Sequence, residues 1–240
     1  MQTADTLGRG NFQVGVETGV LSAASSSAPI GDGNPSWIPH VDVSARFGVS
    51  EGVDLGLRAG LSFLELQGKF LFTKPGERVA VSFAPTAGGL LLGGSGSSAS
   101  SIVGLLNVGL PVLIGFKTSG GSEFVIGPRV QNLVLLAGTS TVYGVGVGGS
   151  IGFAIRFTEN FGLMPEASIV VPVAGAAAFA SQFQSASVLG TGLFFFQFKI
   201  GVLVGKFRPA PNAKPVEPPP STIPPPGQVP ISNQPLPEGT

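Results

Sequence analysis

The stretch HVDVSARFGVS, residues 40–50, decides the fold class because its apolar and polar residues alternate strictly. In an extended chain Val41 and Val43 point to one side, whereas Asp42 and Arg46 point to the other. A period of two is typical of a β-strand that has one apolar and one polar face. The stretch therefore predicts a strand whose second face carries charged residues.

The same alternation continues through VDLGLRAGLS at 53–62 and LELQGKFLFT at 64–73. A helical membrane protein is the main alternative, because uncharged stretches such as 79–116 and 167–198 exceed the roughly 20 residues of a membrane-spanning helix. Glycine-rich runs and prolines such as Pro111 disfavour helix, and a helix gives no reason for a period of two. We therefore predict an all-β protein.

Ten strands are predicted from this pattern, at about 11–24, 39–50, 53–62, 64–73, 78–92, 102–118, 123–136, 141–158, 162–174 and 191–207. Tight polar turns follow the second, fourth, sixth and eighth strands, and longer Ser, Gly and Ala-rich loops follow the first, fifth and ninth. Alternating short and long connections are typical of transmembrane barrels. The predicted fold is a closed antiparallel up-and-down transmembrane β-barrel of about ten strands, with a range of eight to twelve.

One face of the predicted strands collects the large apolar residues, which we expect to face lipid, among them Phe47, Phe70, Phe72, Phe116, Phe153, Phe194, Phe196 and Phe198. The other face carries six acids and eight bases, namely Glu17, Asp42, Arg46, Asp54, Arg58, Glu65, Lys69, Arg78, Lys117, Glu123, Arg129, Arg156, Glu166 and Lys199. The remaining residues of that face are mostly small, which suits a narrow lumen in which charges pair. Because the last strand must pair with the first, we expect Lys199 to lie buried beside acids such as Glu17.

The composition divides the chain into a lead-in at 1–10, the barrel at 11–207 and a tail at 208–240. The tail contains twelve prolines and almost no large apolar residue, so we predict a disordered, extended tether that reaches about 90–100 Å. A disordered tail with no partner is the alternative. The chain has no cysteine and a net charge of +0, which exclude disulfides and give no indication of nucleic-acid binding. The N-terminus shows no signal peptide, which indicates either a cytoplasmic chain or a mature form.

The segment RFGVSEGVDLGLRAG, residues 46–60, resembles the periplasmic hairpin of small bacterial outer-membrane β-barrels of the OmpA-like or OmpW-like type. The resemblance covers about residues 11–207. It implies an outer-membrane location, a lipid bilayer around the barrel, and assembly by machinery that recognises a terminal aromatic, here Phe207. By alternation Phe207 faces the lumen, a departure from that type. The opening QTADTLGRGNFQ also resembles the start of mature barrel lipoproteins, with Met1 where the lipidated cysteine would stand.

The functional expectation is a non-enzymatic envelope anchor, with residues 208–240 reaching a periplasmic or cell-wall partner. A narrow pore or transporter for small or apolar molecules is the alternative. A minor alternative is a lipid-modifying enzyme that uses His40, the single histidine, which lies near Asp42 and several loop serines. One histidine gives no metal-ligand spacing, and inward-facing strand glycines explain GVGVGG at 144–149, so no metal or cofactor is expected.

Overall fold

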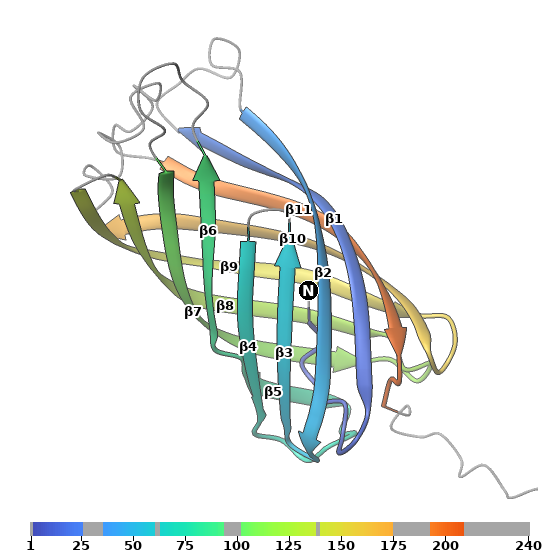
Figure 1. Ribbon diagram of the computed structural model, residues 1–240. Helices are drawn as coiled ribbons and strands as arrows, with labels where there is room; N and C mark the ends of the chain where they lie inside the picture. Colours follow the sequence, from blue (N-terminus) through green and yellow to red (C-terminus); the bar gives the residue numbers. More distant parts are fainter. Residues whose placement is uncertain are drawn as a thin grey trace, which may run out of the picture.

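The computed structural model describes residues 2–25, 36–60, 63–93, 102–137, 140–174 and 193–208 (Figure 1). Its strands are β1 (Phe12–Ser25), β2 (Ser36–Ser50), β3 (Val53–Gly60), β4 (Phe63–Leu71), β5 (Val79–Phe83), β6 (Thr86–Gly93), β7 (Ile102–Lys117), β8 (Glu123–Ala137), β9 (Ser140–Arg156), β10 (Phe161–Ala174) and β11 (Leu193–Gly205). The described part of the chain has no helix long and apolar enough to cross a membrane.

The strands form one closed antiparallel sheet. β1 pairs with β11 along its whole length, from Gln13 opposite Gly205 to Ser25 opposite Leu193, and this pairing closes the ring. β5 and β6 both lie between β4 and β7, so the eleven strands occupy ten positions around the barrel. The prediction of a closed antiparallel barrel of about ten strands is confirmed.

The predicted strand at 78–92 is interrupted at Ala84 and Pro85, which separate β5 from β6. Pro85 has no N–H to donate to a neighbouring strand. The interruption is still held on both sides, because Gly68 N–H donates to the Pro85 carbonyl at 2.9 Å and Ala84 N–H donates to the Pro111 carbonyl at 2.9 Å. The ring therefore stays closed across this interruption.

The alternation that predicted β2 is visible in the burial of its residues. Val41 and Val43 are exposed on the outside of the barrel, whereas Asp42, Ser44 and Arg46 are buried on the inside. The strand pairs with β1 on one side and β3 on the other, so neither edge is left free. Backbone pairing and side-chain alternation thus place every charged residue of β2 in the lumen.

The two ends of the barrel differ in their connections. The short connections 51–52, 72–78, 118–122 and 157–160 lie at one end, here called the turn end, where β1 also begins and β11 ends (Figure 1). The Ser, Gly and Ala-rich loops predicted at the opposite end lie mostly outside the described residues. Residues 209–240, which hold the prolines of the predicted tail, lie outside them as well.

Candidate functional site

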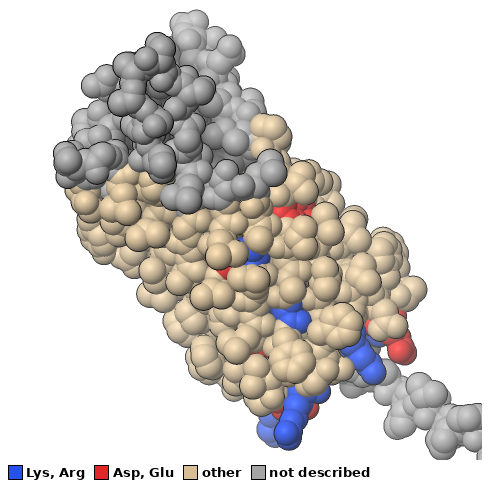
Figure 2. All heavy atoms as spheres, in the orientation of Figure 1, with Lys and Arg blue, Asp and Glu red and all other residues tan. Residues whose placement is uncertain are grey.

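The outer surface of the barrel is apolar around its circumference. Large apolar side chains that are 37–69% exposed come from strands β1 to β5 and β7 to β11 or from residues next to them. On the face shown in Figure 2, charged atoms gather mainly near the turn end. A soluble monomer rarely exposes apolar surface on this scale, and an apolar exterior around a polar interior is the arrangement of a transmembrane β-barrel. The prediction of a transmembrane β-barrel is confirmed.

The phenylalanines predicted to face lipid mostly lie on this surface. Phe47, Phe70, Phe72, Phe116, Phe153 and Phe198 are exposed on the outside, and Phe196 is half-buried. The side chain of Phe194, which belongs to β11, lies outside the described part of the structure.

Glu17 of β1 lies at the centre of a charge network in the middle of the lumen, and it is 0% exposed. Its Oε2 is 3.4 Å from Lys199 Nζ and 3.6 Å from Arg58 Nε, and its Oε1 accepts a hydrogen bond from Ser44 Oγ at 3.2 Å. Because β1 lies between β11 and β2, one carboxylate reaches bases from both directions around the ring. The buried charge is thereby neutralised, as burial requires.

Arg58 and Lys199 extend the network to further acids. Arg58 Nε donates to Asp42 Oδ2 at 3.1 Å, and its Nη1 lies 3.8 Å from Glu65 Oε1. Lys199 Nζ lies 3.5 Å from Glu166 Oε1. The network therefore spans β1, β2, β3, β4, β10 and β11, and it ties one side of the lumen together.

Residues 2–8, here called the N-terminal segment, lie inside the lumen at the turn end. Thr3, Ala4, Asp5, Thr6 and Leu7 are each at most 8% exposed. Sequence reasoning treated this stretch as a lead-in and missed its position. The lumen is therefore filled at this end by main chain as well as by side chains of the barrel wall.

Lys69 binds the main chain of the N-terminal segment. Its Nζ donates to the carbonyl oxygens of Thr3 and Asp5, at 2.6 Å and 3.2 Å. It also lies 4.0 Å from Asp54 Oδ2. The ammonium group, which is 1% exposed, thus has two carbonyls and a carboxylate in place of water.

Two wall carboxylates accept the main-chain N–H groups of the same segment. Ala4 N–H donates to Glu123 Oε1 at 2.7 Å, and Leu7 N–H donates to both oxygens of Asp54 at 3.1 Å. These are charge-assisted bonds, which are stronger than neutral ones. An extended peptide is held here by its backbone donors and acceptors together.

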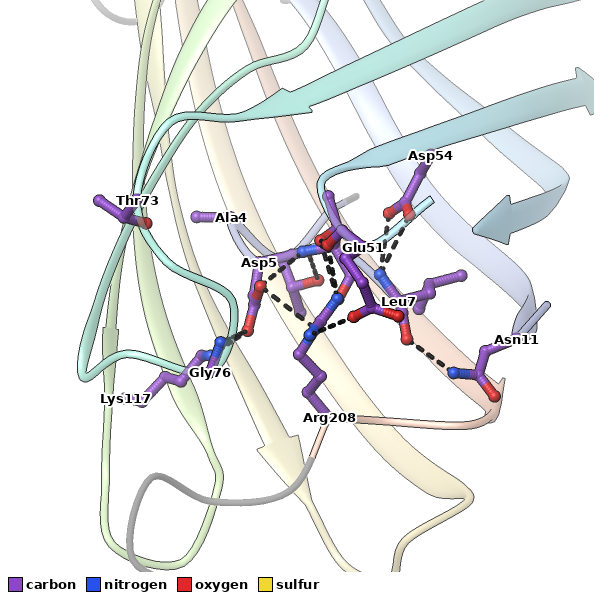
Figure 3. A network of polar contacts seen from close by, with 12 residues as sticks. Ala4, Asp5, Leu7, Asn11, Glu51, Asp54, Thr73, Gly76, Lys117 and Arg208 are labelled. Atoms are coloured by element: carbon purple, nitrogen blue, oxygen red, sulfur yellow. Dashed lines mark hydrogen bonds and ion pairs between the residues drawn. The ribbon is translucent and has the colours of Figure 1, made fainter. Parts of the chain in front are cut away.

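Asp5 carries the ion pairs of the segment (Figure 3). Its carboxylate pairs with Lys117, accepts from Gly76 N–H at 3.2 Å and lies 3.5 Å from Arg208 Nε. Arg208 also donates from Nε to the Thr6 carbonyl at 2.8 Å. Arg208, which the composition assigned to the tail, therefore belongs to the turn end of the barrel.

The N-terminal segment turns into β1 through close backbone contacts with Gly48 of β2. Gly10 N–H donates to the Gly48 carbonyl and Gly48 N–H donates to the Asn11 carbonyl, both at 2.8 Å. Gly8 and Gly10 adopt positive φ angles of 85° and 76°, which favour glycine. A Cβ atom on Gly48 would collide with the Gly8 carbonyl, so this contact requires glycine.

A small apolar cluster packs beside these polar contacts in the lumen. It contains Ala4, Ala80, Ala84, Leu113, Val125, Ala154, Met164, Leu203 and Phe207. Phe207, after the end of β11, is 9% exposed, and its N–H donates to the Glu159 carbonyl at 3.0 Å. The terminal aromatic therefore lies inside the barrel, on the side that its alternation predicts.

A cavity of about 90 Å³ lies next to Gln2 in the lumen. Arg129 and Lys199 line it together with small residues such as Ser150 and Gly152. Among the described residues, Arg129 Nε and Asn107 Oδ1 are buried side-chain atoms without a hydrogen-bond partner. The cavity is thus polar, and its wall also includes Arg58 and the acids Glu65 and Glu166.

The remaining predicted charges lie at the turn end. Arg46 is buried and donates to Gln13, whereas Arg156 is half-buried and donates to the carbonyls of Arg208 and Thr158, at 2.9 Å and 3.1 Å. The placement of Arg78 in the lumen is wrong. β5 begins at Val79, so the alternation does not extend to Arg78, which is exposed in the turn.

His40 lies near the opposite end of the barrel from the turns. Its Nε2 is 3.1 Å from Gln197 Nε2 and 3.8 Å from Asp42 Oδ2. In the described strands these neighbours are an amide and a carboxylate rather than a serine hydroxyl. A serine nucleophile would need its hydroxyl within hydrogen-bond reach of this ring, and the Ser-rich loops at this end lie mostly outside the described residues.

The charges assigned to the lumen gave no signal of the missing segment. The strand pattern placed six acids and eight bases there, but Arg78 is exposed and Arg156 is half-buried, so the apparent excess of buried bases comes from these two residues. Asp5 supplies one carboxylate, and the carbonyls of Thr3 and Asp5 supply acceptors for Lys69. The position of residues 2–8 in the lumen could not be predicted from the sequence, because no alternation of apolar and polar residues marks this segment.

No protein-family model matches the chain. No curated protein matches it either. Similar solved structures include Neisserial surface protein A (14% identity, 82% of this chain and 97% of that chain covered, TM-score 0.39). They also include the outer membrane protease OmpT from Escherichia coli (9% identity, 86% of this chain and 100% of that chain covered, TM-score 0.43). A third is the translocator domain of autotransporter NalP from Neisseria meningitidis (12% identity, 84% of this chain and 90% of that chain covered, TM-score 0.44). At these TM-scores the fold assignment depends on the strand pairing itself.

Proposed function

We propose that the protein is a bacterial outer-membrane barrel that acts as a non-enzymatic envelope anchor, with its lumen closed by its own chain. One observation carries this proposal: the N-terminal segment fills the turn end of the lumen and is bound by wall charges such as Lys69, Lys117 and Glu123. A wall that binds its own chain so extensively favours a closed barrel over a permanently open pore. The apolar exterior supports the membrane location.

The arrangement around His40 favours a non-enzymatic role over lipid modification. Among the described residues its ring lies beside Gln197 and Asp42, neither of which carries a hydroxyl. On this proposal we expect the His40→Ala variant to fold into the barrel. We also expect the lipids of the membrane to be the same with the variant as with the unmodified protein.

The proline-rich residues 209–240 are, on this proposal, a tether on the periplasmic side. β11 ends at the turn end, and Arg208 is fixed there by Glu51, whose carbonyl accepts from Nη2 at 2.7 Å. The extended chain therefore starts from a fixed point at the barrel rim and runs toward a periplasmic or cell-wall partner.

The closed-barrel proposal predicts that the purified protein in a planar lipid bilayer gives no stable conductance. The N-terminal segment and the Glu17 network block the lumen, so ions have no continuous path. Single-channel recording tests this directly. A long-lived open state of the unmodified protein would contradict the proposal.

Deletion of residues 209–240 tests the tether. We expect the shortened barrel to keep its fold, because Arg208 and its contacts with Glu51 and Thr6 remain. Chemical cross-linking in intact envelopes should then lose any product that the full chain forms with a periplasmic or cell-wall partner. An unchanged cross-linking pattern would show that the tail holds no partner.

A further inference from the structure

We propose that the N-terminal segment is a displaceable plug, and that the barrel becomes a narrow pore that prefers small anions when this segment leaves the lumen. The inference rests on the membrane location proposed above. It adds conduction of small anions to the closed barrel, because the closed lumen is then one of two states and the open lumen is the other.

The contacts of the segment allow it to leave without unfolding the barrel. Residues 2–8 pair with no strand of the sheet, and the register of β1 with β2 and β11 begins only at Phe12 and Gln13. Side chains of the wall hold the segment through hydrogen bonds and ion pairs. Gly8 and Gly10, whose positive φ angles mark a turn, join it to β1. Release would therefore cost polar contacts and the burial of Ala4 and Leu7, but no ladder pairing.

A path for small solutes continues beyond the segment. The cavity of about 90 Å³ adjoins Gln2, and it extends along β7, β8 and β9, where Gly109, Ser150 and Gly152 contribute little side-chain volume. The Glu17 network borders the same cavity through Arg58, Glu65, Glu166 and Lys199, which line it from β3, β4, β10 and β11. Departure of residues 2–8 would thus connect the turn end to this cavity along the small-residue wall.

The charges left behind favour anions. Asp5 leaves with the segment and removes the carboxylate next to Lys117 and Arg208, while Lys69 loses two carbonyl acceptors. The turn end then holds four bases, Arg46, Lys69, Lys117 and Arg208, and three acids, Asp54, Glu123 and Glu51, the last of which is 3.1 Å from Arg208 Nη1. Further in, three bases (Arg58, Arg129 and Lys199) and two acids (Glu65 and Glu166) line the cavity, and Arg129 Nε has no hydrogen-bond partner among the described residues. Excess positive charge along a narrow path selects anions.

Gly48→Ala tests the plug without changing any charge in the lumen. The added Cβ would collide with the Gly8 backbone, whereas strand pairing of β2 accepts alanine. Gly52→Ala is the matched control, because a Cβ there would meet no atom closer than 3.8 Å. We expect Gly48→Ala to raise the fraction of time in a conducting state at least tenfold over Gly52→Ala, with a reversal potential that indicates anion preference. Heat-dependent gel mobility in SDS verifies that both variants are folded.

Asp5→Ala is the second variant, and it changes only the segment. It removes the partner of Lys117 and Arg208 while leaving every strand residue in place. If Gly48→Ala does not fold, Asp5→Ala tests the plug in its place, because we expect Asp5→Ala to show the same conducting state. Folded variants that stay silent, or that conduct with cation preference, would overturn the inference.

Access to the cavity gives an independent readout. The chain has no cysteine, so Ser150→Cys places a single thiol in the cavity wall. An anionic methanethiosulfonate reagent should modify this thiol at least tenfold faster when Gly48→Ala is also present. Equal rates with and without Gly48→Ala would overturn the inference. Conductance of the unmodified protein would instead contradict the proposed closed barrel, so the two failures are distinguishable.

Discussion

Replacing Glu17 with alanine is expected to lower the free energy of unfolding by about 3–5 kcal/mol, because it leaves buried bases without their carboxylate. Glu17 is 0% exposed and lies within 3.4 Å of Lys199 and 3.6 Å of Arg58. The substitution keeps both bases in the lumen and removes the charge that offsets their desolvation. Urea unfolding of the barrel in lipid vesicles, followed by gel mobility, measures the change.

Glu77→Ala is the matched control for this experiment, because Glu77 is exposed in the turn before β5. Its effect should stay within about 0.5 kcal/mol, as for most surface substitutions. Adding Lys199→Met to Glu17→Ala should recover part of the loss, since the unpaired ammonium group is then removed as well. Equal stability of the Glu17 and Glu77 variants would contradict the assignment of a buried charge network.

Val43→Arg is expected to lower the free energy of unfolding by about 2–4 kcal/mol, the cost of a cationic side chain near the middle of a bilayer. Val43 lies at the centre of β2, points outward and is half exposed. The same substitution at Val79, the first residue of β5 at the turn end, should cost only about 0–1 kcal/mol because the side chain lies near the interface.

The comparison uses the same unfolding assay and needs no further variant. Both positions are exposed valines on strands, so local strand propensity is similar. A depth-dependent difference identifies lipid as the surrounding solvent. Arginine tolerated equally at Val43 and Val79 would place that surface in water.

Strand positions and faces were largely predictable because the barrel wall is one residue thick. In β2, Val43 faces outward and Asp42 inward, and a period of two reports this directly. The closing pair was predictable for the same reason, since an antiparallel barrel must join its first and last strands. Lys199 therefore lies beside Glu17.

Contacts that do not follow the strand period were not predictable. The N-terminal segment is held by Lys69 and Glu123, which belong to separate strands and converge only when the ring closes. Arg78 was misplaced because β5 begins one residue after it, at Val79, so the alternation of the strand does not include that side chain. The interruption at Pro85 was not predicted, because the bond of its carbonyl to Gly68 depends on the register of a neighbouring strand.

The most direct test of the transmembrane barrel is fluorescence quenching by lipids brominated near the middle of their acyl chains. With the single natural tryptophan replaced by Trp37→Phe, one tryptophan is introduced either at Val43 or at the exposed turn residue Thr118. The account predicts strong quenching for Val43→Trp and little for Thr118→Trp. Equally weak quenching at both positions would contradict it.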